Sequence, residues 1–158
     1  MAIKNRIILG LMTFGPDVEW GAKTTSLEEF GTFLDHFQAA GYDEGDTART
    51  YQNGSQEGFT AAVAHEPKAL REALEESLKQ LETDCVNIFY LHAPDRSVPF
   101  EKTLETVNEL YKEGKFKQFG LSNFAAFEVA EIVMICREKG WVRPSIYQGC
   151  YNAISERI

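Results

Sequence analysis

The feature that most constrains the fold of this chain is an alternation between short apolar runs and longer amphipathic segments. In the longer segments apolar residues recur at helical spacing, as Phe30, Phe33 and Phe37 do. The short runs have strand length and end beside glycine or polar residues. Repeated strand-then-helix units are typical of a parallel α/β architecture, so we expect a single α/β domain over residues 1–158.

Five segments have the character of parallel strands. Val86–His92 is the clearest, because its nearly continuous apolar run suits a strand buried on both faces. Tyr42–Thr47 is weaker, because Gly45 breaks its alternation and offers no side chain to pack. The five expected strands are Ile7–Gly10, Tyr42–Thr47, Val86–His92, Phe116–Leu121 and Ser145–Gly149.

Five helices are expected around these strands, with glycine and proline marking several of their ends. One step of the repeat is irregular. The segment Gln56–Ala64 favours a helix because it is rich in alanine, and it leads into the next helix at Pro67 without an intervening strand. The expected helices run from Thr25 to Gly41, from Gln56 to Ala64, from Pro67 to Leu81, from Pro99 to Gly114 and from Phe124 to Lys139.

Composition and charge argue against a protein that binds nucleic acid, spans a membrane or is secreted. The net charge is −8 and the pI is about 4.9, so binding to a nucleic-acid backbone is not expected. No apolar stretch approaches the ~20 residues that span a bilayer, and the N-terminus does not resemble a signal peptide. Three widely spaced cysteines fit a reducing compartment. We therefore expect a cytoplasmic protein that acts away from membranes.

Polar residues that can carry chemistry stand at the ends of several expected strands. In parallel α/β proteins functional groups gather at the carboxyl ends of the strands. Asp46 and Tyr51 belong to the end of the second strand, and His92 ends the third. An aspartate, a tyrosine and a histidine on one rim indicate acid–base chemistry. The other polar residues at strand ends are Ser122, Asn123 and Gln148.

Each of these residues also has a purely structural interpretation. A histidine after a strand often packs or caps, and Asp46 could form a turn or a cap. A Ser-Asn pair before a helix is usually an N-cap, which applies to Ser122. A loop tyrosine such as Tyr51 usually covers apolar surface, and Gln148 could be a hydrogen-bonding core residue. The residue types alone leave both interpretations open.

Four motifs, read in order, closely resemble the aldo-keto reductases, and in particular their aflatoxin-aldehyde reductase branch. The motifs are GDTARTY, IFYLHAPD, EGKFKQFGLSNF and GWVRPSIYQGCYNAI. The resemblance extends from about Ile7 to the last residue. It implies a (β/α)8 TIM barrel, of which this chain holds about five βα units with parallel strands and outer helices. It also implies NADP-dependent reduction of small-molecule aldehydes and ketones to alcohols.

The resemblance assigns a role to each candidate residue. It implies that Tyr51 is the general acid that protonates the substrate carbonyl oxygen, and that His92 orients that carbonyl. It places Asp46 beside the tyrosine and the nicotinamide of NADP(H). The nicotinamide carboxamide is implied to bind polar side chains, which suit an amide because an amide offers both donors and acceptors. The implied cofactor-binding residues are Asp46, Ser122, Asn123 and Gln148, and no metal is implied.

The chain departs from the family pattern in two places. The family's third strand, which carries a catalytic lysine, has no counterpart between residues 59 and 67, and Lys68 aligns with the helix that follows. A free tyrosine has a pKa near ~10, so without this lysine Tyr51 is expected to be a poorer acid. Arg49 is a candidate replacement partner for the aspartate. The second departure is the C-terminal half of the barrel, which in the family supplies the sites for the adenosine phosphates.

Three functional hypotheses follow. The first is an NADPH-dependent carbonyl reductase, completed by a second copy or a partner chain, or belonging to a longer natural chain of which this sequence is a piece. The second is a catalytically inactive binding or assembly module, which the missing lysine favours. The third is a non-redox enzyme in which Tyr51, His92 and Asp46 transfer a proton without nicotinamide. Cofactor binding separates the first hypothesis from the other two.

Overall fold

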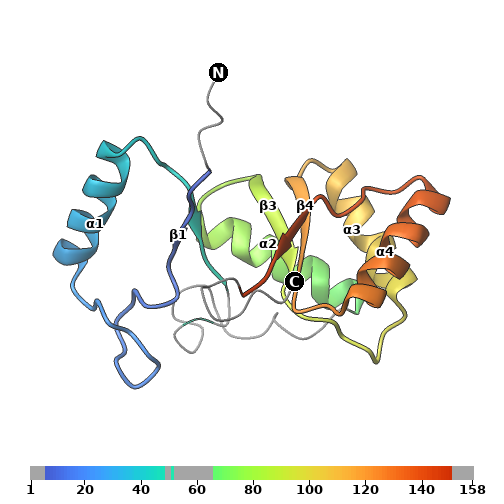
Figure 1. The fold of residues 1–158 in the computed structure, drawn as a ribbon, viewed down its shortest axis with the longest axis horizontal. Helices are drawn as coiled ribbons and strands as arrows, with labels where there is room; N and C mark the ends of the chain where they lie inside the picture. Colours follow the sequence, from blue (N-terminus) through green and yellow to red (C-terminus); the bar gives the residue numbers. More distant parts are fainter. Residues whose placement is uncertain (1–5, 49–50, 52–65, 151–158) are drawn as a thin grey trace. The chain divides into compact units, whose positions relative to one another are not determined.

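A computed structural model describes residues 6–48, 51 and 66–150 of the chain. In these residues four helices alternate with five strands, and the strands pair in parallel (Figure 1). This confirms the expected parallel α/β architecture, which corresponds to part of a (β/α)8 barrel; the described strands form no closed barrel. The helix expected over residues 56–64 lies outside the described residues, as does Arg49.

The chain consists of two compact units, Met1–Thr60 and Ala61–Ile158. The first unit contains β1 (Leu9–Gly10), α1 (Leu27–Ala39) and β2 (Gly45–Asp46). The two strands pair in parallel over two residues each. Both strands are therefore shorter than the segments Ile7–Gly10 and Tyr42–Thr47 that the sequence predicts.

Local contacts account for helix α1 and its packing. The Oγ atom of Ser26 caps the helix by accepting a hydrogen bond of 3.3 Å from the backbone N–H of Glu29. The rings of Phe30 and Phe33 lie 4.9 and 5.4 Å from the ring of Phe14, centroid to centroid. The helically spaced aromatic residues thus pack the helix onto the loop that follows β1.

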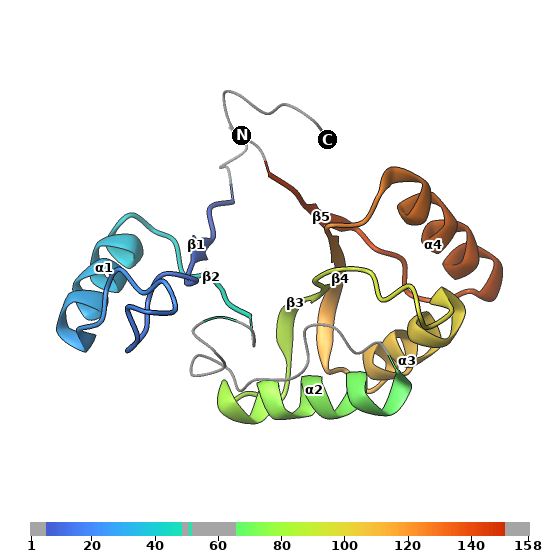
Figure 2. The ribbon, with the colours of Figure 1, turned by 90° about the horizontal axis from the view of Figure 1, so that it is seen from below.

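The second unit is a three-stranded parallel sheet with three helices on one face. The strands lie in the order β3, β4, β5, so β4 is central. Figure 2 shows α2, α3 and α4 on the same side of this sheet. The elements are α2 (Pro67–Gln80), β3 (Val86–Leu91), α3 (Phe100–Lys112), β4 (Phe116–Ser122), α4 (Ala126–Lys139) and β5 (Ile146–Gln148). Each begins and ends within two residues of its predicted bounds.

Apolar side chains between the sheet and its helices form the core of the second unit. Phe119 and Leu121 lie on the helix-facing side of β4, and Gly120 and Ser122 on the other side, because successive strand residues alternate between faces. Burial raises the pKa of the Cys136 thiol to about 11. The most completely buried side chains are Phe116, Phe119, Leu104, Leu110, Leu121, Ile132, Val107, Thr103 and Cys136.

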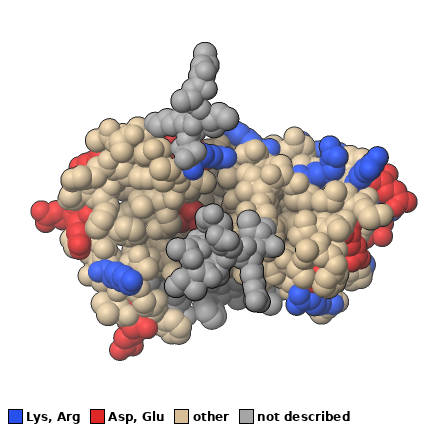
Figure 3. Space-filling model, in the orientation of Figure 1, with Lys and Arg blue, Asp and Glu red and all other residues tan. Residues whose placement is uncertain are grey.

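Charged residues form ion pairs between neighbouring helices of the second unit. Arg71 on α2 donates hydrogen bonds of 2.7 Å to Glu113 and 3.1 Å to Glu109, at the end of α3. Lys139 on α4 lies 2.5 Å from Glu101 on α3. Acidic and basic side chains are interspersed on the face shown in Figure 3. None of the helices in the described ranges is long and apolar enough to cross a membrane.

A tyrosine ring on β3 fills the space beside a glycine on β4. Tyr90 and Gly120 are paired directly across the two strands. A Cβ atom added to Gly120 would lie 2.5 Å from two ring atoms of Tyr90, which is closer than carbon atoms approach one another. The position therefore requires glycine for as long as the ring occupies this site.

We predict that Gly120→Ala lowers the free energy of unfolding by about 1–3 kcal/mol, because the added methyl group overlaps the ring. Urea denaturation followed by circular dichroism measures the change. The matched control is the same substitution in a Tyr90→Ala background, where it should be nearly neutral. Equal losses in the two backgrounds would show that the ring is not the obstacle.

Candidate active site

Parallel pairing places three predicted site residues at one edge of the sheet in the second unit. Ser122 of β4 and Gln148 of β5 are directly paired and are the last residues of their strands. Leu91 of β3 pairs with Leu121 of β4 one residue earlier, and His92 follows β3 directly. The carboxyl ends of β3, β4 and β5 therefore bring His92, Ser122 and Gln148 to the same edge.

Asn123 joins the ends of two of these strands. Its side-chain Nδ2 donates a hydrogen bond of 2.8 Å to the backbone carbonyl of His92 and one of 3.1 Å to Oγ of Ser122. Its φ angle is +61°, in the left-handed region that asparagine enters more readily than most residues. The chain thus turns immediately after β4, and the amide of Asn123 fastens this turn to the end of β3.

The interpretation of Ser122 as a helix N-cap is wrong. Helix α4 begins at Ala126 with Ala125 at the N-cap position, and Ser122 is instead the last residue of β4. The capping side chain is Glu128, whose Oε2 accepts a hydrogen bond of 2.8 Å from the backbone N–H of Ala125. Ser122 is left at the strand end, nearly buried, with its hydroxyl bonded to Asn123.

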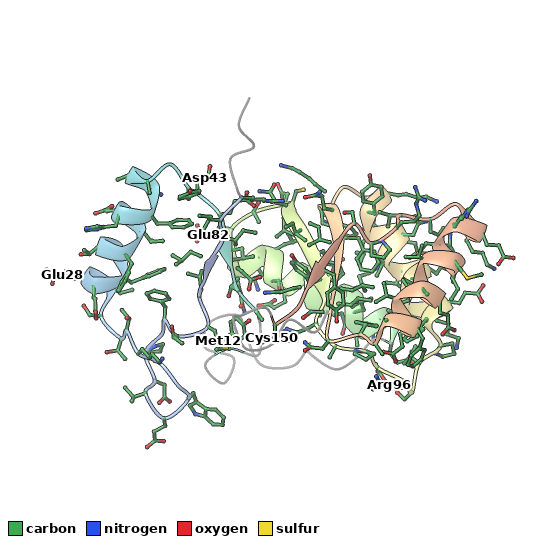
Figure 4. All side chains as sticks on the ribbon, viewed as in Figure 1. Met12, Glu28, Asp43, Glu82, Arg96 and Cys150 are labelled. Atoms are coloured by element: carbon green, nitrogen blue, oxygen red, sulfur yellow. The ribbon has the colours of Figure 1, made fainter. Side chains whose placement is uncertain are left out.

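Glu128 also fixes the loop between β3 and α3. Nε of Arg96 donates to its Oε1 at 2.8 Å, and a terminal guanidinium nitrogen donates to its Oε2 at 3.2 Å. The Glu128 side chain is 3% exposed, whereas that of Arg96, which is labelled in Figure 4, is 66% exposed. This two-point contact with a buried carboxylate is a strong and directional form of ion pair.

The environment of Glu128 acts on its pKa in opposite directions. Burial is the largest single influence and raises the pKa, but the hydrogen bonds from the Ala125 N–H and the Arg96 guanidinium, together with the positive charge of Arg96, lower it by more than burial raises it. The net pKa is therefore below the ordinary value of 4.5. Glu128 and Arg96 were not identified from the sequence, although a glutamate three residues after an N-cap position is a recognisable capping signal.

Two further contacts shape the same edge of the sheet. The hydroxyl of Tyr147 on β5 donates a hydrogen bond of 2.8 Å to the backbone carbonyl of Phe124. Oδ1 of Asp95 accepts bonds from the backbone N–H of Ser97 at 3.0 Å and from its hydroxyl at 2.6 Å. These contacts hold the segment before α4 to β5 and close a turn in the loop before α3.

Asp46 and Tyr51 belong to the first unit. Asp46 is the last residue of β2, and its backbone carbonyl accepts a hydrogen bond of 2.9 Å from the N–H of Leu11. The backbone N–H of Tyr51 donates a bond of 3.0 Å to the carbonyl of Ala48. Both residues therefore lie at and beyond the end of β2, as expected, and their catalytic roles stay predictions.

The side chains gathered in the second unit match the chemistry of a carboxamide. Ser122 has a hydroxyl, and Asn123 and Gln148 have amides, so the edge provides both donors and acceptors. Both hydrogen bonds of the Asn123 Nδ2 group go to the protein, which leaves Oδ1 as the atom suited to accept from a ligand. The residues thus fit the nicotinamide end of NADP(H). In the described ranges no three acidic, histidine or cysteine residues are grouped to hold a metal ion.

These features agree with the family to which the chain belongs. The sequence profile of the aldo/keto reductase family matches residues 60–158, and the chain is a member of that family. It is 37% identical to aflatoxin B1 aldehyde reductase member 2 of Mus musculus, over 96% of this chain and 46% of that protein. It is 42% identical to an aldo-keto reductase of Pseudocercospora fijiensis, over 79% of this chain and 50% of that protein.

A higher identity is found over a shorter stretch. The chain is 52% identical to aldo-keto reductase family 7 member A3 of Homo sapiens over 92 residues, which is 58% of this chain and 28% of that protein. The chain spans about half the length of the first curated relatives that it matches.

The alignment lengths also reveal residues that this chain lacks. The alignment with the mouse protein extends over 174 residues but covers 96% of a 158-residue chain, which is about 152 residues. About 22 positions of the relative, the difference between those lengths, therefore have no counterpart here.

We predict that Asn123→Ala destabilises the chain more than Asn123→Gly. Both variants lose the bonds to His92 and Ser122, at about 1 kcal/mol each. Alanine must in addition adopt the left-handed conformation, which costs roughly 1–2 kcal/mol and which glycine adopts freely. Thermal unfolding of the two variants measures the difference, and equal losses would contradict the assigned backbone conformation.

We predict a stability loss in acid that depends on Glu128. Its folded-state pKa is lowered, so its contribution to stability is present above about pH 4.5 and is lost as the pH falls through the folded-state pKa. Urea midpoints measured from pH 7 to pH 3 should therefore fall less steeply in Glu128→Gln than in the natural chain. Parallel pH profiles for the two proteins would contradict this assignment.

Proposed function

We propose that the chain forms the nicotinamide-binding and carbonyl-orienting part of an NADP(H)-dependent reductase that converts small-molecule aldehydes or ketones to alcohols. Membership of the aldo/keto reductase family supports an oxidoreductase acting on carbonyl compounds. The observation that carries the finer proposal is the bonded group of His92, Asn123 and Ser122, one strand away from Gln148. The group combines a candidate carbonyl ligand with candidate carboxamide ligands.

The proposed mechanism gives each residue the role that the resemblance to the family implies. Ser122, Asn123 and Gln148 would hold the carboxamide of a bound nicotinamide, whose chemistry would be hydride transfer. His92 donates a hydrogen bond to the substrate carbonyl oxygen, which orients the carbonyl and increases its positive character at carbon. Tyr51 then donates its phenolic proton to the oxygen that becomes the alcohol, beside Asp46.

The missing lysine sets a limit on this chemistry. A cation near a tyrosine stabilises the phenolate and so lowers a pKa that is otherwise near ~10. Because the family lysine has no counterpart in this sequence, we expect Tyr51 to be a weaker acid than its family equivalent. The reductase activity of this chain alone is therefore expected to be impaired.

The same absence favours a second candidate function, in which the chain is an inactive binding or assembly module. In a third, Tyr51, His92 and Asp46 transfer a proton in an isomerisation or elimination without nicotinamide. The proton-transfer function requires the phenol of Tyr51 and the module does not, so Tyr51→Phe distinguishes them. Neither function requires NADPH.

The decisive experiment is a fluorescence titration of the purified 158-residue chain with NADPH, with NADH as the comparison cofactor. The proposal predicts saturable binding that prefers NADPH, weakened in Ser122→Ala. Tyr51→Phe should bind NADPH as the natural chain does but lose reduction of an aldehyde substrate. Absence of binding by a folded sample, verified by circular dichroism, would set aside the autonomous reductase and favour the cofactor-independent functions.

We also propose a cellular location, a substrate class and a state of association for the protein. We place it in the cytoplasm, acting on a small-molecule carbonyl substrate, together with a second copy or a partner chain that completes the barrel. The acidic net charge of −8 fits a freely diffusing protein. Light scattering after size-exclusion chromatography measures the state of association, and a monomer at all concentrations would exclude the second copy.

A further inference from the structure

We infer that Arg96 and Glu128 are positioning residues for the nicotinamide-binding side chains. Together with the backbone N–H of Ala125 they form a clasp that fastens the loop after β3 to the segment after β4. The inference rests on the proposed function for its catalytic meaning, because the fastened segments carry His92 and Asn123. The clasp itself is defined by contacts within the second unit alone.

The geometry of the clasp uses both carboxylate oxygens of Glu128. Oε1 accepts from Nε of Arg96 at 2.8 Å, and Oε2 accepts from Ala125 at 2.8 Å and from Arg96 at 3.2 Å. The carboxylate therefore bonds at once to its own helix terminus and to a residue 32 positions earlier in the chain. Its orientation is set from two directions, which a single surface ion pair does not achieve.

Burial makes the clasp different from an ordinary surface pair. A buried carboxylate that loses its cation is left with an uncompensated charge, so the segment around it must move to reach water or take up a proton. Glu128 is 3% exposed, and Ala125 stands between it and Asn123 in the chain. Movement of this terminus therefore displaces the turn at Asn123 and the hydroxyl of Ser122.

The clasp acts in parallel with a second connection between the same segments. Asn123 donates to the carbonyl of His92 where β3 ends, and Arg96 reaches Glu128 four residues further along that loop. Two connections at different points fix both the separation and the relative rotation of the segments. One connection alone fixes only the separation, so loss of the clasp leaves the His92–Asn123 bond as a pivot.

Arg71 provides a matched control, because it resembles Arg96 chemically but lies elsewhere. It donates to Glu113 at 2.7 Å and to Glu109 at 3.1 Å, and so joins α2 to the end of α3. These helices cover the outer face of the sheet, away from the residues that end β4 and β5. Arg71→Gln removes contacts with two carboxylates, and Arg96→Gln removes contacts with both oxygens of one carboxylate. Only the contacts of Arg96 lie beside the proposed cofactor site.

The experiment compares the natural chain with Arg96→Gln, Arg96→Lys, Glu128→Gln and Arg71→Gln. Titration with NADPH measures affinity, and saturation-transfer NMR with NADP⁺ measures the contact of the nicotinamide and adenine protons separately. Arg96→Gln and Glu128→Gln should weaken NADPH binding about tenfold or more and lose transfer selectively at the nicotinamide protons. Arg96→Lys should restore part of the loss, and Arg71→Gln should leave affinity unchanged.

Failure of the clasp and failure of the proposed function lead to different results. If the natural chain binds NADPH and the clasp variants bind it equally well, or lose both ends of the cofactor together, the positioning role is overturned. If the natural chain does not bind NADPH, the proposed function fails for the chain on its own, and the clasp is judged by amide hydrogen exchange. Exchange at Ser122 and Asn123 that accelerates in Glu128→Gln by more than the loss of global stability accounts for supports the clasp, and exchange that accelerates by no more than that overturns it.

Discussion

The parallel pairing of β4 with one strand on each side determines where the candidate site of the second unit lies. The backbone ladder fixes the register residue by residue, so Ser122 and Gln148 share a row and His92 follows the neighbouring strand. A slip of one residue would turn Ser122 toward the helices and Leu121 away from them. Gly120 permits the observed register, because the Tyr90 ring occupies the volume that a side chain would need. The position of the polar edge thus depends on steric fit in the middle of the sheet.

Beyond the strand ends, electrostatics replaces steric fit as the organising force. The segments after β3 and β4 have no ladder to hold them, and they are joined instead by an amide and by a buried carboxylate. The Glu128 carboxylate stays charged because the Arg96 guanidinium and the Ala125 N–H outweigh the effect of burial on its pKa. The buried charge is compensated by two sets of contacts: it caps α4 through the N–H of Ala125, and it binds Arg96 in the loop after β3.

The sequence predicted the second unit well because hydrophobic periodicity and helix-terminating residues act locally. All six of its strands and helices were expected, and His92, Ser122 and Gln148 were placed at strand ends from chain order alone. The first unit was predicted less well, since the ladder of β1 and β2 depends on long-range pairing that apolar runs do not specify. Glu128 was missed because a buried glutamate in an amphipathic segment resembles a solvent-exposed one until its cation is located. The roles of Asp46 and Tyr51 come from family resemblance, since residue type alone leaves several explanations open.

The buried thiol of Cys136 has a chemical consequence of its own. With a pKa of about 11, its thiolate makes up roughly one part in ten thousand at neutral pH, and the thiolate is the form that reacts with oxidants and alkylating agents. The side chain is also 1% exposed, so the folded core protects this sulfur twice, by protonation and by exclusion of reagents. Cys150 is exposed and lacks that exclusion. The chain therefore contains a natural chemical reporter, in which modification of Cys136 records opening of the core between α4 and the sheet.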